Sequence, residues 1–301
     1  MSRLLNAFRS CGGVIAAGLL VLAGVLPAQQ GWAQGAASHA PEPGGVEYGF
    51  LNSSDMDKAG TVSLELDTVG LYGRRGRHFA SSDTLLNLAY AVTDQVQVAF
   101  GPQFTIASVH VVPGLPDVRR ALLGGFRGDL RLGLIDRRSN PIGLTLQFTP
   151  QWRFADEAVR RGAAHGLAVS LALDRELIAG TLFGTLNLTY EMTHQRIDGI
   201  AGWERGSRAG LGLGLAARLS KVLHVGAEFR YLRRHDGFAA GRFHGHAFYL
   251  GPTVYAEFGG NWWASLSWQT QIAGHEVGKR HGMDLIGFER HQVRLRVGYD
   301  F

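Results

Sequence analysis

Residues 86–100 read LNLAYAVTDQVQVAF, and in both halves of this stretch every second residue is large and apolar. A period of two is typical of a β-strand whose two faces meet different surroundings. The polar residues 93–95 fall between the two halves, so the stretch predicts two strands joined by a tight turn. The same alternation recurs in twelve segments between Thr61 and Phe301, which predicts an all-β protein.

The composition of the 301-residue chain excludes several other classes of protein. Hydrophobic residues make up 46% of the chain, which is too much for a disordered protein. A single cysteine cannot form a disulfide within the chain. The longest apolar run, residues 14–26, is too short to cross a bilayer as a helix, so a helical membrane bundle is also excluded.

The first 33 residues have the order of a secretory signal peptide. Arg3 and Arg9 precede the apolar run, Pro27 ends it, and small residues surround Trp32. We expect cleavage after Ala33, which removes Cys11 and lowers the formal net charge from +5 to +3. A net positive charge this small does not indicate a nucleic-acid partner. A membrane anchor is the alternative for this run.

The connections between the twelve segments alternate in length. Short connections are expected at residues 93–95, 136–141, 174–180, 220–222 and 259–261. Long loops are expected at residues 73–82, 105–125, 153–165, 193–208, 233–246 and 272–290. Short turns at one end, long loops at the other and an even strand number are the layout of an outer-membrane barrel. We therefore predict one antiparallel barrel over residues 61–301, with both termini on the periplasmic side and residues 34–60 as a periplasmic N-terminal segment.

A soluble β-sandwich also alternates, but two features argue against it. Long aliphatic residues occur in all twelve segments, so no strand is marked as a protected edge. Aromatic residues gather at both segment ends, as in the two girdles of a membrane barrel. They are Tyr72, Phe104, Trp152, Tyr190, Tyr231, Phe248 and Trp268 at the long-loop ends, and Tyr90, Phe258, Trp262, Tyr299 and Phe301 at the short-turn ends.

The end of the chain carries a resemblance to a known class of proteins. Apolar residues alternate through Val293, Leu295, Val297, Tyr299 and Phe301. This ending resembles the terminal strand of Gram-negative outer-membrane proteins, which ends in Phe and is read by the barrel-assembly machinery. The resemblance implies insertion into the outer membrane of a Gram-negative bacterium.

A second resemblance covers the first half of the chain. It rests on the sequence GFLNSSD at 49–55, on Gly60, Leu64 and Glu65, and on the alternation that leads through residues 93–95. These residues resemble the outer-membrane transporters grouped with the meta-pathway of phenol degradation, although Tyr90 is followed here by Ala91 instead of Gly. The resemblance implies a porin-like barrel with a role in uptake and with no catalytic residue or cofactor.

If the long aliphatic residues face lipid, their sequence neighbours face the lumen. The predicted lumen-lining residues are Glu65, Asp67, Arg127, Asp129, Arg131, Glu191, Arg218, Glu228, Arg230, Glu257, Arg294 and Arg296. Their charges nearly balance, which leaves two interpretations. The side chains pair across a narrow lumen and brace the wall, or they create a field that selects polar or charged solutes.

Many inward positions hold small residues, among them Gly210, Gly212 and Gly214. These residues leave space inside the barrel, either for a pore or for residues 34–60 or a long loop folded inward. The glycines lie on one face of a predicted strand, so they do not form a nucleotide-binding loop.

Other chemistries have weaker support in the sequence. Ser108 and His110 are spaced as in an outer-membrane acyl hydrolase, but we expect no carboxylate or amide beside them. His244 and His246, with His235, His275 and His281 in nearby loops, have a spacing that can bind a metal ion, although solvated loop histidines are the simpler interpretation. The long loops are rich in arginine, which indicates a solvated rim, capture of anionic solutes or, as we favour, contact with lipopolysaccharide phosphates.

The sequence therefore predicts a non-enzymatic, porin-like outer-membrane protein without cofactor or metal. It would pass small molecules, which the resemblance suggests are aromatic or hydrophobic. A non-conducting structural or surface-interaction barrel is the second interpretation, and an acyl hydrolase is the third. The expected partners are outer-membrane lipids and lipopolysaccharide, the assembly machinery and a small solute.

Overall fold

The computed structural model describes residues 47–259, 261–278 and 282–301. The predicted signal peptide, 1–33, and residues 34–46 of the predicted N-terminal segment lie outside these described residues. In the described part of the chain no helix is long and apolar enough to cross a membrane.

The described residues form twelve strands, each of which corresponds to one of the twelve predicted segments. They are β1 (Val62–Tyr72), β2 (His78–Thr93), β3 (Val96–His110), β4 (Val118–Ile135), β5 (Gly143–Ala155), β6 (Arg161–Ile178), β7 (Leu182–Ile197), β8 (Glu204–Arg218), β9 (Leu223–Asp236), β10 (Phe243–Phe258), β11 (Trp262–Glu276) and β12 (His291–Asp300).

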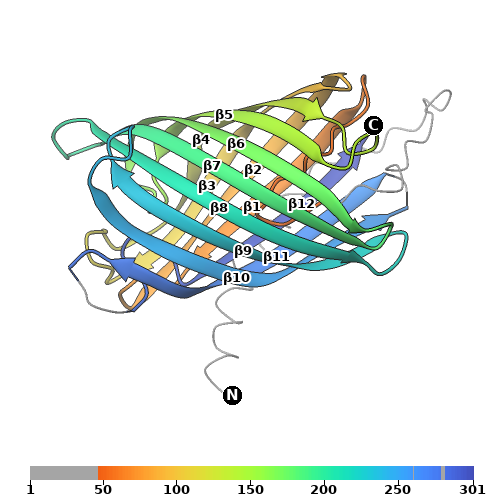
Figure 1. Cartoon of the computed structure of the whole chain (residues 1–301). Coiled ribbons are helices and arrows are strands. Elements are labelled where there is room, and N and C mark those ends of the chain that lie inside the picture. Colours follow the sequence, from red (N-terminus) through yellow and green to blue (C-terminus); the bar gives the residue numbers. More distant parts are fainter. Residues whose placement is uncertain (1–46, 260, 279–281) are drawn as a thin grey trace. The chain divides into compact units, whose positions relative to one another are not determined.

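The strands close into a single antiparallel barrel (Figure 1). Each strand pairs with its sequence neighbours, and β1 pairs with β12 from Ser63 opposite Asp300 to Tyr72 opposite His291. Closure leaves no open edge, so every strand has a hydrogen-bonding partner on both sides, as a bilayer requires. The predicted fold class is therefore confirmed.

Side chains alternate between the two faces of the wall as the period of two predicts. In β2, Leu88 is 56% exposed on the outer face, whereas its neighbour Asn87 is 8% exposed on the inner face. Outward aromatic residues meet at the short-turn end, where the rings of Trp262 and Tyr299 lie 5.0 Å apart and the ring of Phe301 packs 4.8 Å from that of Tyr299.

The long loops lie at the predicted end of the barrel, but they are shorter than expected. The loop expected at 153–165 contains only residues 156–160, and the one expected at 193–208 contains only 198–203. The strands continue beyond the region where one face is apolar, so their sequence loses its period of two although their backbone ladder persists. Arg161 and Arg208, which we expected in loops, therefore belong to β6 and β8.

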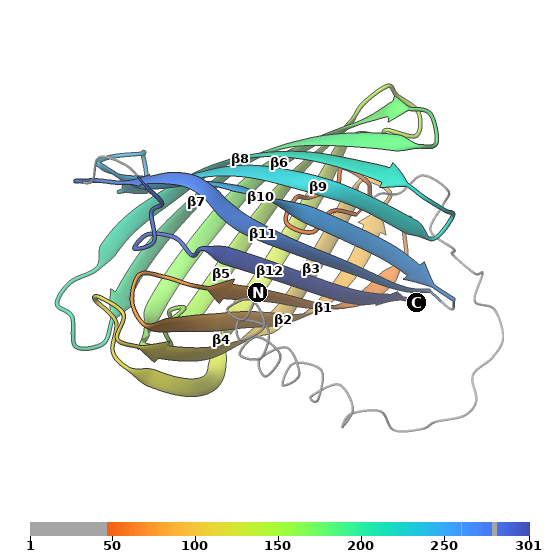
Figure 2. The same ribbon diagram turned by 90° about the horizontal axis from the view of Figure 1, so that it is seen from below.

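The described residues that precede β1, from Glu47 onward, lie inside the barrel (Figure 2). They are coloured orange in Figure 2, which shows this segment within the ring of strands. The contacts of residues 47–60 determine how the lumen is divided.

Candidate functional site, a lumen with two chambers

The backbone of residues 47–60, here called the inner segment, is bonded to the barrel wall along much of its length. Glu228 of β9 accepts hydrogen bonds from the backbone N–H groups of Gly49 (2.5 Å) and Phe50 (2.8 Å). Asn187 of β7 accepts from the N–H of Asn52 (2.7 Å) and donates to its carbonyl (2.9 Å). β7 and β9 both adjoin β8, but the segment is also held by Arg131 of β4, five strands from β9, which donates to the carbonyls of residues 53 (2.9 Å) and 55 (3.0 Å), so the inner segment crosses the lumen.

Further bonds hold the second half of the inner segment. The N–H of Ser54 donates to Asp174 (2.6 Å), and the carbonyl of Ser54 accepts from Thr145 (2.7 Å). The guanidinium of Arg137, in the turn after β4, donates to both carboxylate oxygens of Asp55. These contacts place Ser54 and Asp55 against β5, β6 and their neighbouring turn.

The inner segment packs closely because glycine occupies the points of contact. A side chain at Gly49 would collide with Ser267, and a side chain at Gly212 would collide with Leu51. Leu51 and Tyr48 are buried, and they form a cluster with Phe183 and Ala216 of the wall. The inward glycines of β8 therefore provide the space into which Leu51 packs.

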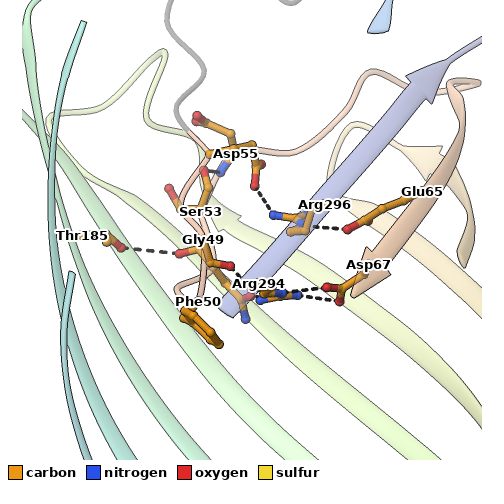
Figure 3. A network of polar contacts seen from close by, with 12 residues as sticks. Gly49, Phe50, Ser53, Asp55, Glu65, Asp67, Thr185, Arg294 and Arg296 are labelled. Atoms are coloured by element: carbon orange, nitrogen blue, oxygen red, sulfur yellow. Dashed lines mark hydrogen bonds and ion pairs between the residues drawn. The ribbon is translucent and has the colours of Figure 1, made fainter. Parts of the chain in front are cut away.

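Two arginines of β12 join the inner segment to β1 (Figure 3). Arg294 donates to both oxygens of Asp67 (2.8 Å each) and to the carbonyl of Gly49 (2.9 Å). Arg296 donates to Glu65 (2.6 Å) and to Glu47 (2.8 Å). These five charged side chains are arranged as the bracing interpretation expects, since each arginine has a carboxylate within hydrogen-bonding distance.

A buried polar layer lies at the level of Phe50. Glu228, which is fully buried, also accepts from Gln269 (3.0 Å). Arg230 donates to Gln269 (2.7 Å) and to Gln292, and its guanidinium lies 3.9 Å from the centroid of the Phe50 ring. Two of the predicted lumen residues, Glu228 and Arg230, therefore hold the inner segment.

The first chamber, at the short-turn end, has a volume of about 610 Å³. Its lining includes residues 47, 52–53 and 55–58 of the inner segment and nine of the predicted lumen residues, namely Glu65, Asp67, Arg127, Asp129, Arg131, Arg218, Glu257, Arg294 and Arg296. Most of the polar groups here are already paired: Asp129, for example, accepts from Gln147 (2.6 Å) and Thr149 (2.5 Å) and lies 3.2 Å from Arg127.

The second chamber, at the long-loop end, has a volume of about 820 Å³. Among the predicted lumen residues only Glu191 lines it, and no residue of the inner segment does. The sequence analysis did not assign Arg74, Arg153, Glu157, Arg208, Arg234 and Glu289 to the lumen, although all of them line this chamber. Every second residue of a strand faces the lumen, and this alternation continues beyond the apolar part of β5, β8 and β9. Extending it would have identified Arg153, Arg208 and Arg234 as inward residues.

A compact ion-pair cluster closes one side of the second chamber. Arg74, in the loop after β1, pairs with Glu157 (2.7 Å) and with Glu289. Burial of Glu157 disfavours its charge, but the nearby guanidinium groups of Arg74, Arg208 and Arg153 outweigh that effect and hold the pKa of its carboxyl well below the ordinary 4.5. The same two carboxylates raise the pKa of Arg74 against the effect of its burial.

The predicted alternative sites lie elsewhere. We expected no carboxylate near Ser108 and His110, and this is wrong for His110, whose Nδ1 lies 2.6 Å from Asp117. The expectation failed because the chain turns back between β3 and β4 and brings Asp117 beside His110. No hydrogen bond joins Ser108 to His110 in the described part of the chain.

The histidines do not converge on a single point. The rings of His246 and His275 lie 5.9 Å apart, and both stand beside Phe243. His244 is paired with Asp236 instead, and His281 lies outside the described residues. Among the residues that the structure describes, no group of three or more potential ligands could hold a metal ion.

Comparison with known proteins identifies the architecture. The chain superposes on the COG4313 outer membrane channel from Pseudomonas putida F1 with a TM-score of 0.56 and 12% identity, covering 83% of this chain and 99% of that one. The β domain of the Bordetella autotransporter BrkA gives a TM-score of 0.51 and 13% identity, covering 81% and 100%. At such low identity the two structures show that the fold is shared and nothing more.

The chain also matches a family defined by sequence. No curated protein matches it. Residues 43–301 match the model described as a family of unknown function, DUF6662. The resemblance to outer-membrane barrels is thus confirmed, and the chain belongs to the DUF6662 family with the fold of an outer-membrane β-barrel channel.

Proposed function

We propose that this protein is an outer-membrane channel for small solutes and that its inner segment controls passage. The observation that carries the proposal is the pair of polar chambers, about 610 and 820 Å³, at the two ends of one barrel. A barrel with a purely structural role would not need unfilled space on both sides of a crossing segment. The predicted lumen residues would line the path on the short-turn side.

The orientation and the route to the membrane are part of the proposal. Both termini would face the periplasm after cleavage near Ala33, and the alternating ending at Val293 to Phe301 would be read by the assembly machinery. Exposed arginines near the long-loop end, such as Arg119 and Arg120 at the start of β4, would contact lipopolysaccharide.

The solute class follows from the second chamber. Its lining includes Leu71, Val112, Leu115, Ile286 and Phe288 beside its charged groups. A mixed lining of this kind suits small molecules with an apolar or aromatic part, as the family resemblance implies.

Conductance in planar bilayers tests the proposal. The full-length protein should conduct weakly, and deletion of residues 47–56 should raise single-channel conductance several-fold, because these residues occupy the lumen. Deletion of residues 37–46, which has equal length, serves as the control and should change conductance little.

The other interpretations predict different outcomes. If neither the full-length protein nor the deletion variant conducts, the barrel is a structural or surface-interaction protein. Hydrolysis of phospholipid that is lost in Ser108→Ala would favour the acyl hydrolase instead, for which the His110–Asp117 pair is the supporting observation.

A further inference from the structure

The second chamber has more positive than negative side chains. Nine arginines and six carboxylates line it, so three positive charges are in excess. Most of these arginines have a close carboxylate: Arg153 lies 3.0 Å from Asp83, Arg160 lies 2.7 Å from Asp156, and Arg242 lies 2.9 Å from Asp236. Asp83 is not one of the six lining carboxylates, nor is Glu276, which pairs with Arg75, so the excess around the chamber is smaller than three. Among the described residues, the lining arginines without a carboxylate this close are Arg196, Arg205, Arg208 and Arg234.

Two of these, Arg208 and Arg234, face each other on neighbouring strands. They occupy directly opposite positions of the β8–β9 ladder, and both line the chamber. Like charges opposite each other in a sheet repel and destabilise the pairing. An anion bound between the two guanidinium groups would relieve this repulsion.

Neither arginine of the pair has a carboxylate at hydrogen-bonding distance among the described residues. The closest carboxylate to Arg208 is that of Glu191, at 3.8 Å, which also accepts a hydrogen bond from Gln151 (3.1 Å). The Nε of Arg208 is buried and has no hydrogen-bond partner. Arg234 donates to the backbone carbonyl of Gly287 (2.8 Å), and no carboxylate of the described residues forms an ion pair with it.

Apolar side chains stand next to the arginine pair. Gly287, which accepts the bond from Arg234, is flanked by Ile286 and Phe288, and all three residues line the chamber. Phe288 is buried with Ala247 and Tyr249, whereas Ile286 is 47% exposed. The chamber therefore offers an exposed apolar surface within one residue of the group that holds Arg234.

We propose that Arg208 and Arg234 together bind the carboxylate of a small organic acid, with the apolar or aromatic part of that acid lying against Ile286. The proposal rests on the channel function above and specifies its solute as an anion with an apolar body. Two guanidinium groups can bind the two oxygens of one carboxylate with charge-assisted hydrogen bonds. The bound anion removes the repulsion across the β8–β9 ladder and supplies a partner for Arg208.

Calorimetric titration of the purified full-length protein in detergent tests this site. Sodium benzoate is the probe, benzyl alcohol is its neutral counterpart, and sodium phosphate is an anion without an apolar body. We expect saturable binding of benzoate and at least about tenfold weaker binding of the other two, because each lacks one half of the interaction.

Variants localise the binding. The double variant Arg208→Gln with Arg234→Gln should bind benzoate at least about tenfold more weakly. Arg160→Gln removes the same type of charge from the same chamber, but its arginine is already paired with Asp156, so the affinity should stay within about twofold. Ile286→Glu places a carboxylate beside the pair on an exposed side chain, so this variant should fold, as heat-modifiability will show, and should lose benzoate binding.

The outcomes separate this site from the channel function. Equal binding of benzoate and phosphate, or equal loss in Arg160→Gln and in the double variant, overturns the site, since either result means that only net charge matters. Conductance without benzoate binding also overturns it and leaves the channel in place. Benzoate binding that needs Arg208 and Arg234, without any conductance, upholds the site and refutes the channel.

Discussion

The two chambers of the lumen differ in how their arginines are neutralised. Eight cationic and nine acidic side chains line the short-turn chamber, and Arg294 and Arg296 each contact a carboxylate at hydrogen-bonding distance. In the long-loop chamber nine arginines meet six carboxylates, and Arg208 and Arg234 oppose each other. The first chamber therefore pairs its charges closely and holds the inner segment, whereas in the second Arg208 and Arg234 have no carboxylate at hydrogen-bonding distance among the described residues.

The largest expected effect is a loss of stability when a closely paired arginine of the first chamber is replaced. Arg294→Gln leaves the carboxylate of Asp67, which is 4% exposed, without its bidentate partner. Removal of one member of a buried ion pair costs about 3–5 kcal/mol of unfolding free energy. Urea unfolding of the barrel in lipid vesicles measures the loss.

Arg208→Gln is the matched control in the other chamber. Its only ion pair is long and its side chain is 42% exposed, so the unfolding free energy should change by less than about 1 kcal/mol. Similar losses in the two variants would show that the chambers do not differ in the way we describe.

A smaller effect concerns the attachment of the inner segment. Glu228→Gln replaces one acceptor oxygen with an N–H₂ group that faces the N–H groups of Gly49 or Phe50. One buried donor then loses its partner, at a cost of about 1–3 kcal/mol. Because the inner segment is held less firmly, limited proteolysis should cut it faster than in the native protein. Glu257→Gln changes a lumen carboxylate that has no bond to the inner segment among the described residues, so this variant should be cut at the native rate.

The smallest effect is a dependence on pH in the long-loop chamber. The pKa of Glu157 is lower in the folded protein than its ordinary 4.5, so its ionised form stabilises the fold above that pH. As the pH falls below about 4.5, Glu157 is protonated in the unfolded chain but stays paired with Arg74 in the folded protein, so this stabilisation is progressively lost. The temperature of heat-modification should therefore fall between about pH 5 and about pH 3.

Arg74→Met removes the cause of the shift and should flatten this part of the pH profile. A profile that is unchanged in the variant would mean that other carboxylates produce the pH dependence.

The sequence by itself determined the barrel, because the wall obeys a local rule. A strand between lipid and a polar lumen must alternate, so Leu88 and Asn87 reveal their faces through their order in the chain alone. The same parity identified Asp67, Glu228 and Arg294 as inward residues. The alternation also separated short turns from long loops. It underestimated the length of strands such as β8, whose first residues are polar on both faces.

Only the tertiary structure decided which charges are paired and which are left over. Arg294 meets Asp67 because β12 closes on β1, and Arg208 meets Arg234 because of the β8–β9 register. The inner segment reaches Glu228 across 179 positions of sequence, a contact that no local pattern encodes. Alternation depends on nearest neighbours along a strand, whereas pairing across a lumen depends on register and closure, which the folded barrel alone establishes.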